Sequence, residues 1–139
     1  MSTLSIKSSV DDTVLSIKDI HRDKSGELQD YRVCATRTGL ESNAKVCGYL
    51  SDGFIDFLID LDETMSRNNG WSGEKSWTSL EGEFDLSATS DSLGHVTLIA
   101  TIKSGHYDLD WVLHVGLELD AIKLSELSKD AKRLVSDDA

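Results

Sequence analysis

The chain contains no proline and only two cysteines among its 139 residues. Without proline, no slow prolyl isomerisation limits folding, and sheet edges must be protected by charge or by other elements. Cys34 and Cys47 lack the CxxC spacing of metal or redox motifs, so we expect two reduced thiols. No apolar run is long enough for a signal peptide or a membrane span. These absences predict a cytoplasmic protein that does not contact membranes.

Basic residues are also scarce, since 14 Lys and Arg stand against 25 Asp and Glu and give a formal charge of -11. Such a surface repels nucleic-acid phosphates and attracts basic proteins and cations. We therefore expect no nucleic-acid binding; the acidic charge indicates either solubility alone or a basic protein partner. The apolar content of 39% and the length suit one globular domain, residues 1–139, with an ordered core over roughly 3–135.

Catalytic motifs are absent as well. The chain has no GxSxG, no glycine-rich phosphate loop and no HExxH. The sequence therefore predicts a protein that is not an enzyme and carries no cofactor.

What is present is mostly alternating apolar and polar residues, the pattern of half-buried strands. The tetrapeptide LSIK occurs at 4–7 and 15–18, which predicts a hairpin with Leu4 and Ile6 facing Leu15 and Ile17. Segments 28–38 and 44–50 predict a second hairpin, closed by residues 39–42. That loop would place Cys34 opposite Cys47, both as buried apolar side chains.

Residues 51–70 have the spacing of an amphipathic helix. Ser51 is the expected N-cap and Gly70 the expected stop. Its polar side carries acidic residues, and a second helix closes the chain. The apolar positions are Phe54, Phe57, Leu58, Leu61 and Met65 in the first helix and Leu124, Leu127, Ala131, Leu134 and Val135 in the second.

Segments 83–90, 95–103 and 106–119 predict a three-stranded meander. A two-residue turn at Ser104-Gly105 pairs four apolar residues of the second strand with four of the third: Ile102 with Tyr107, Ala100 with Leu109, Leu98 with Trp111, and Val96 with Leu113. The preceding turn, 91–94, matches Phe84, Leu86 and Ala88 with Ala100, Leu98 and Val96. The predicted fold class is α+β, an antiparallel sheet of about seven strands with two helices packed on its apolar face.

The same register places His95 opposite His114, close enough to share a metal or a proton. The neighbouring strand offers Thr89 and Ser87 beside them, with Asp85 about two pairs away. Because zinc sites use three or four protein ligands, this constellation is incomplete. A small metal-binding protein or enzyme built on His95 and His114 is therefore an alternative hypothesis.

Two of the three tryptophans, Trp71 and Trp77, lie in a segment rich in Asn, Gly and Ser. We expect Trp77 to pack beneath the first helix. Trp71 is surrounded by polar residues and is the better candidate for an exposed anchor, although burial remains open. Aromatic residues dominate the energetics of protein interfaces. The candidate partner-binding residues are Trp71 and the acidic positions of the helix, Asp52, Asp56, Asp60 and Glu63.

The order WxGxxxW, LxGE and GHV resembles a family of small uncharacterised bacterial proteins. Its positions here are Trp71, Gly73, Trp77, Leu80, Gly82, Glu83, Gly94, His95 and Val96, ahead of Leu117–Leu119 and a helix. The layout is similar to immunity proteins of WapA-type polymorphic toxins, in which a helix with an FxxF/L pattern precedes the meander. The resemblance covers roughly residues 28–135 and implies a fold rather than an activity.

The leading hypothesis is a non-enzymatic protein-binding module, an immunity protein that masks a basic toxin domain. A third alternative is a structural or assembly subunit, which predicts a homodimer burying Trp71 or an open sheet edge.

Overall fold

The computed structural model describes residues 3–47, 53–104 and 110–136. Their elements follow the order ββββαββββα. The first half contains β1 (Leu4–Lys7), β2 (Val14–Arg22), β3 (Leu28–Arg37), β4 (Leu40–Cys47) and α1 (Gly53–Asn68). The second half contains β5 (Lys75–Thr78), β6 (Phe84–Ser90), β7 (His95–Lys103), β8 (Val112–Asp120) and α2 (Ala121–Ser136). The α+β class is confirmed.

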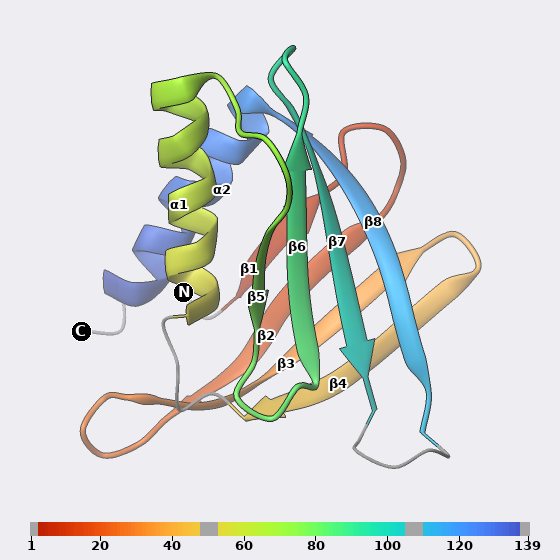
Figure 1. Ribbon diagram of the computed structural model, residues 1–139. Helices are drawn as coiled ribbons and strands as arrows, with labels where there is room; N and C mark the ends of the chain where they lie inside the picture. Colours follow the sequence, from red (N-terminus) through yellow and green to blue (C-terminus); the bar gives the residue numbers. More distant parts are fainter. Residues whose placement is uncertain (1–2, 48–52, 105–109, 137–139) are drawn as a thin grey trace.

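The strands form two four-stranded antiparallel sheets, β1-β2-β3-β4 and β5-β6-β7-β8, rather than the predicted single sheet of about seven strands. In Figure 1 the first sheet crosses behind the second at a steep angle. The physical reason for two sheets is the chain order. Each sheet is closed by short local connections, and α1 separates the two sets of strands.

One core serves both sheets and both helices. The two helices contact each other (Figure 1) and bury their apolar positions in this core. All five predicted core residues of the first helix are buried, and so are Leu124, Leu127, Ala131 and Leu134 of the second. No helix among the described residues has the length and apolarity needed to cross a membrane.

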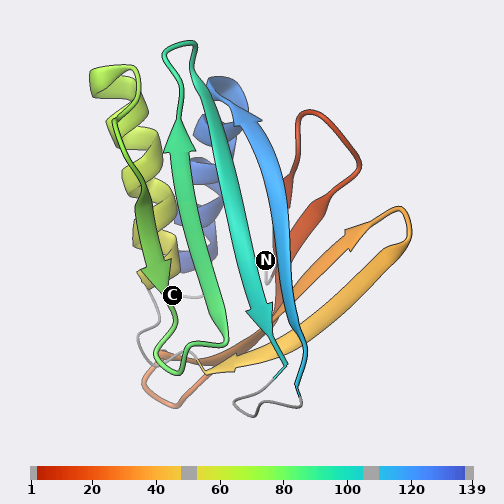
Figure 2. The same cartoon turned by 45° about the vertical axis from the view of Figure 1, so that its right-hand side comes forward.

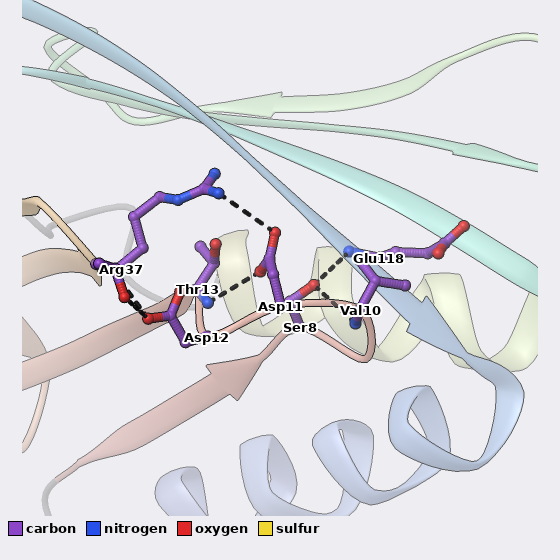
Figure 3. Close-up of polar contacts among 8 residues, drawn as sticks. Ser8, Val10, Asp11, Asp12, Thr13, Arg37 and Glu118 are labelled. Carbon is purple, nitrogen blue, oxygen red and sulfur yellow. Dashed lines mark hydrogen bonds and ion pairs between the residues drawn. The ribbon is translucent and has the colours of Figure 1, made fainter.

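The β1–β2 register is as predicted, with Leu4 opposite Ile17 and Ile6 opposite Leu15. The turn between these strands also joins three parts of the fold (Figure 3). Its Ser9 N–H donates to the carbonyl oxygen of Glu118 on β8 at 2.7 Å.

The other end of this turn fastens to the tip of the β3–β4 hairpin (Figure 3). Asp11 lies 3.7 Å from Arg37, and Asp12 accepts hydrogen bonds from the N–H and the hydroxyl of Thr38. These hydrogen bonds hold the pKa of the Asp12 carboxyl below its ordinary value.

The β3–β4 hairpin differs from the prediction. Arg37 pairs with Leu40, so the turn is the two-residue Thr38-Gly39 with Gly39 at φ 84°. Cys34 therefore pairs with Asn43, not with Cys47. Cys34 is buried, as expected, and Cys47 is half-buried at the end of β4.

The meander registers also differ. Ile102 pairs with Leu113 and Leu98 with Leu117, so the β7–β8 register is shifted by six residues from the predicted one. Ser104 N–H donates to the carbonyl of Trp111 at 3.1 Å, and the connection spans 104–111 instead of two residues. The proposed partners Tyr107 and Leu109 lie outside the described residues.

The β6–β7 register is shifted by two residues, with Phe84 opposite Ile102 and Leu86 opposite Ala100. Both shifts are even, so the predicted core face of each strand is preserved.

Candidate functional site

The solvent side of α1 is acidic. Asp56, Asp60 and Glu63 are exposed, because the helical period turns them away from the buried Phe57 and Leu61. The predicted N-cap Ser51 and the candidate Asp52 lie outside the described residues. The structure therefore confirms an acidic stripe of three carboxylates on a regular helix.

Trp71 follows the end of α1. Asn69 at φ 60° and Gly70 at φ 131° reverse the chain there, so the αL stop predicted at Gly70 begins one residue earlier. The Trp71 N–H then donates to Ser90 Oγ at 2.8 Å, and its indole Nε1–H donates to the carbonyl of Ala88 at 3.2 Å. The side chain is half-buried against the core. Trp71 is thus fastened to β6, and only part of its ring faces solvent.

Lys75 connects Trp71 to the acidic stripe. Its Nζ lies 3.0 Å from Asp60 Oδ2 and 5.8 Å from the centroid of the Trp71 ring. Two candidates that are eleven positions apart in the sequence thus lie around one ammonium group. We call the five residues Asp56, Asp60, Glu63, Trp71 and Lys75 the α1–β5 patch.

The charge of this patch is only partly compensated. Lys75 pairs with Asp60, and Arg67 lies 3.8 Å from Glu63 across one helical turn. Asp56 has no ion-pair partner among the described residues. Exposed pairs of this kind are weak and exchange readily with an incoming cation. A basic partner could therefore bind these carboxylates with little loss of free energy from the ion pairs that it replaces.

Trp77, the second tryptophan of the segment, packs beside the start of α1 as predicted. Its ring centroid lies 6.0 Å from that of Phe54 and 5.5 Å from that of Phe84. A Cβ on Gly53 would lie 2.4 Å from the Trp77 indole nitrogen, so this approach requires glycine. Trp77 is half-buried and acts in packing.

The third tryptophan, Trp111, was predicted in the core opposite Leu98. The structure places it just before β8 with 42% of its surface exposed. The six-residue shift of register is the cause, because it puts Leu117 into the position predicted for Trp111. No sequence signal distinguished these two alternatives.

The proposed histidine pair does not form. His95 pairs with Asp120 and His114 with Thr101, so the two imidazoles are six residues apart along the β7–β8 ladder, about 20 Å. His114 Nδ1 lies 2.9 Å from Thr101 Oγ1. Among the parts of the chain that the structure describes, no three His, Cys, Asp or Glu side chains form a metal-binding group.

His95 is instead paired with Asp91 in the turn before β7. The distance from His95 Nδ1 to Asp91 Oδ2 is 2.9 Å. This hydrogen bond and the carboxylate charge raise the pKa of His95, while hydrogen bonds from the backbone and side chain of His95 lower the pKa of Asp91. The pair closes a turn, which is a structural role.

Three strands of the first sheet carry a row of cations that the sequence reading missed. Lys18, Arg32 and Lys45 lie directly opposite one another on β2, β3 and β4. Like charges in such positions repel. Asp19 lies 3.8 Å from Arg32, and Asp30 lies 3.9 Å from Lys45, so local carboxylates compensate the row. The α1–β5 patch, by contrast, carries three carboxylates and one ammonium group.

Glu83, the acidic residue of LxGE, is buried between the two sheets. Its Oε1 accepts the Ser79 hydroxyl at 2.7 Å, and its Oε2 accepts the N–H of Cys47, the last residue of β4, at 3.0 Å. Glu83 therefore connects β4 to the β5–β6 turn. The sequence signal was a glutamate directly after a turn glycine, Gly82, but burial followed only from the fold.

A solved structure shares this fold. A chain from the crystal structures of Trypanosoma brucei MRP1/MRP2 superposes with a TM-score of 0.54 at 13% identity, covering 97% of this chain and 83% of that one. At this identity the similarity concerns the fold alone. A search of curated proteins finds no match. Residues 6–138 match the model of a family of unknown function, DUF6228, and the chain belongs to that family.

Proposed function

We propose that this protein is a non-enzymatic protein-binding module, an immunity protein that neutralises a basic toxin domain in the cytoplasm. The observation that carries the proposal is the α1–β5 patch. It combines three exposed carboxylates on a rigid helix with a half-buried tryptophan, whose backbone N–H and indole N–H each donate a hydrogen bond to β6. The formal charge of -11 supports it, and so does the resemblance of the layout, an FxxF/L helix ahead of the meander, to immunity proteins.

The chemistry of the patch suits a cationic surface. A partner Lys or Arg would bind Asp56 first, since no cation of the described chain pairs with it. A second partner cation would displace Lys75 from Asp60, and the ring face of Trp71 would then accept either cation. Because the whole chain is acidic, encounter with a basic domain is steered by charge and slows as salt rises.

The test is a binding measurement with the protein domain encoded by the reading frame next to this protein's gene, which the proposal expects to be a basic toxin domain. The chain and that domain are co-expressed and co-purified, and the association rate is measured at several salt concentrations. Asp56→Lys with Glu63→Lys should slow association by about tenfold or more at low salt, because the change reverses two charges of the patch.

Glu126→Lys is the matched control. This residue is exposed on α2 and reverses one charge, so it is compared with Asp56→Lys alone, which undergoes the same change of charge. Equal slowing by Glu126→Lys would mean that overall charge, and not the α1–β5 patch, directs association. Failure of every neighbouring basic domain to co-purify would refute the immunity function itself.

A further inference from the structure

The outer edge of β8 presents backbone groups with no strand beside them. β8 ends the second sheet and pairs only with β7 among the described strands (Figure 2). Glu118 shows which residues face outward, since its N–H donates to Ser8 Oγ and its carbonyl accepts the Ser9 N–H. Alternate residues of a strand point the same way. Val112, His114 and Gly116 therefore direct their N–H and C=O groups away from β7.

This edge lacks the usual protection. Edge strands are normally guarded by charge, proline or a bulge. Residues 112–116, VLHVG, contain no Asp, Glu, Lys, Arg or Pro, and their pairing with β7 is continuous. Cover by the β1–β2 turn begins only at Glu118.

Gly116 has no internal reason to be glycine. Its φ lies outside the left-handed region, and an added Cβ would meet nothing within 4 Å. Glycine inside a strand weakens it and commonly marks a place where another backbone approaches closely. Opposite Gly116 on β7 is Ile99, which is 42% exposed on the uncovered face of the sheet. Gly116 therefore leaves open space beside the exposed Ile99 side chain at this edge.

We propose that a second copy of this chain pairs with this edge, antiparallel about a twofold axis at His114. His114 then lies opposite the partner's His114, and Val112 lies opposite the partner's Gly116. Since all three residues point outward on both copies, the pairing forms about six backbone hydrogen bonds. The two four-stranded sheets become one continuous sheet of twice that width.

The position of the axis follows from which groups are free. An axis at Gly116 would bring the partner's His114 against Glu118, whose N–H and C=O are already bonded to the β1–β2 turn. An axis at His114 uses every outward residue from Val112 to Gly116 and stops before that turn.

The side chains also fit. Val112 is 52% exposed and, in this register, lies over the partner's Gly116, which has no side chain, beside the partner's Ile99. The shared segment, residues 112–116, carries no formal charge, so no like charges face each other within it. A second copy fits this edge because the edge is complementary to itself.

Sedimentation equilibrium over a wide concentration range tests the proposal, with the expected dimer at twice 15.3 kDa. Gly116→Val puts a side chain where the partner's Val112 would pack, and we expect a dimer dissociation constant at least tenfold larger. The variant monomer keeps its fold, because valine suits a strand and the site is open. His114→Glu places two carboxylates across the axis and should also break the dimer. Thr89→Glu, exposed on β6, is the control for charge and should leave the dimer intact.

Backbone hydrogen exchange locates the interface. The amides of Val112, His114 and Gly116 should exchange more slowly in the dimer than in the monomer, whereas the Glu118 amide should not change. A wild-type chain that is monomeric at every concentration overturns the proposal and leaves this edge to a strand of another protein. A dimer that Gly116→Val does not weaken also overturns it.

Discussion

Glu83 offers the sharpest test of how the two sheets are joined. It is a buried carboxylate whose two oxygens accept hydrogen bonds from Ser79 and from the N–H of Cys47. The Ser79 hydroxyl in turn accepts the N–H of Phe84 at 3.1 Å. Replacing Glu83 by alanine removes both acceptors and leaves the Cys47 N–H without one.

The expected loss follows from these contacts. Each hydrogen bond to a charged group contributes about 1.5–3 kcal/mol, and an orphaned buried donor costs about 1–3 kcal/mol. The desolvation of a buried carboxylate opposes these gains. We expect Glu83→Ala to lower the free energy of unfolding by about 3 kcal/mol. Ser79→Ala removes the hydroxyl that donates to Glu83 and accepts from the Phe84 N–H, and should cost about 2 kcal/mol.

Urea unfolding followed by tryptophan fluorescence measures these differences, under conditions that keep the protein in one oligomeric state. The double variant, with alanine at positions 79 and 83, measures the interaction energy between the two side chains, and we expect a coupling of about 1 kcal/mol. If the free energy of unfolding of Glu83→Ala lies within about 0.5 kcal/mol of that of the wild type, the carboxylate does not hold the two sheets together.

Three further changes test the surroundings of the site. Gly53→Ala pushes a methyl group into the Trp77 indole and should cost about 1–3 kcal/mol in urea unfolding; no loss would mean that this contact is not tight. Trp71→Phe removes the indole donor and should lower the free energy of unfolding by about 1 kcal/mol. An unchanged stability would mean that this hydrogen bond does not stabilise the fold. His95 has a raised pKa and Asp91 a lowered one. Their ion pair therefore stabilises the fold in full between pH 3.8 and pH 6.5, the ordinary pKa values of the two side chains. The destabilisation caused by His95→Ala should shrink as pH rises through the folded pKa of His95, and a loss that grows with pH would contradict this sign.

Local patterns in the sequence determined the elements and their buried faces. The helical spacing of α1 and the alternation in β6, β7 and β8 depend only on the geometry of one element, and burial follows them. The β1–β2 register was also predictable, because LSIK repeats on both sides of a short turn. The acidic stripe of Asp56, Asp60 and Glu63 follows from the same helical period.

The registers between strands were harder to predict from the sequence. Strand alternation has a period of two residues, so any even shift keeps the same side chains in the core. Leu113 and Tyr107 satisfy the pattern opposite Ile102 equally well, and only the length of the 104–111 connection selects Leu113. The error moved His114 and Trp111 to false positions and created a histidine pair that does not exist.

The sequence by itself determined the class of the fold, the two amphipathic helices and the charge that a partner would meet. The tertiary structure alone decided that the strands divide into two sheets, that Lys75 brings Trp71 to Asp60, and that Glu83 is buried between β4 and β6. The reason is that periodicity records which side of one element faces apolar surroundings. Contacts between elements depend on connection lengths and on packing in three dimensions, which no single segment encodes.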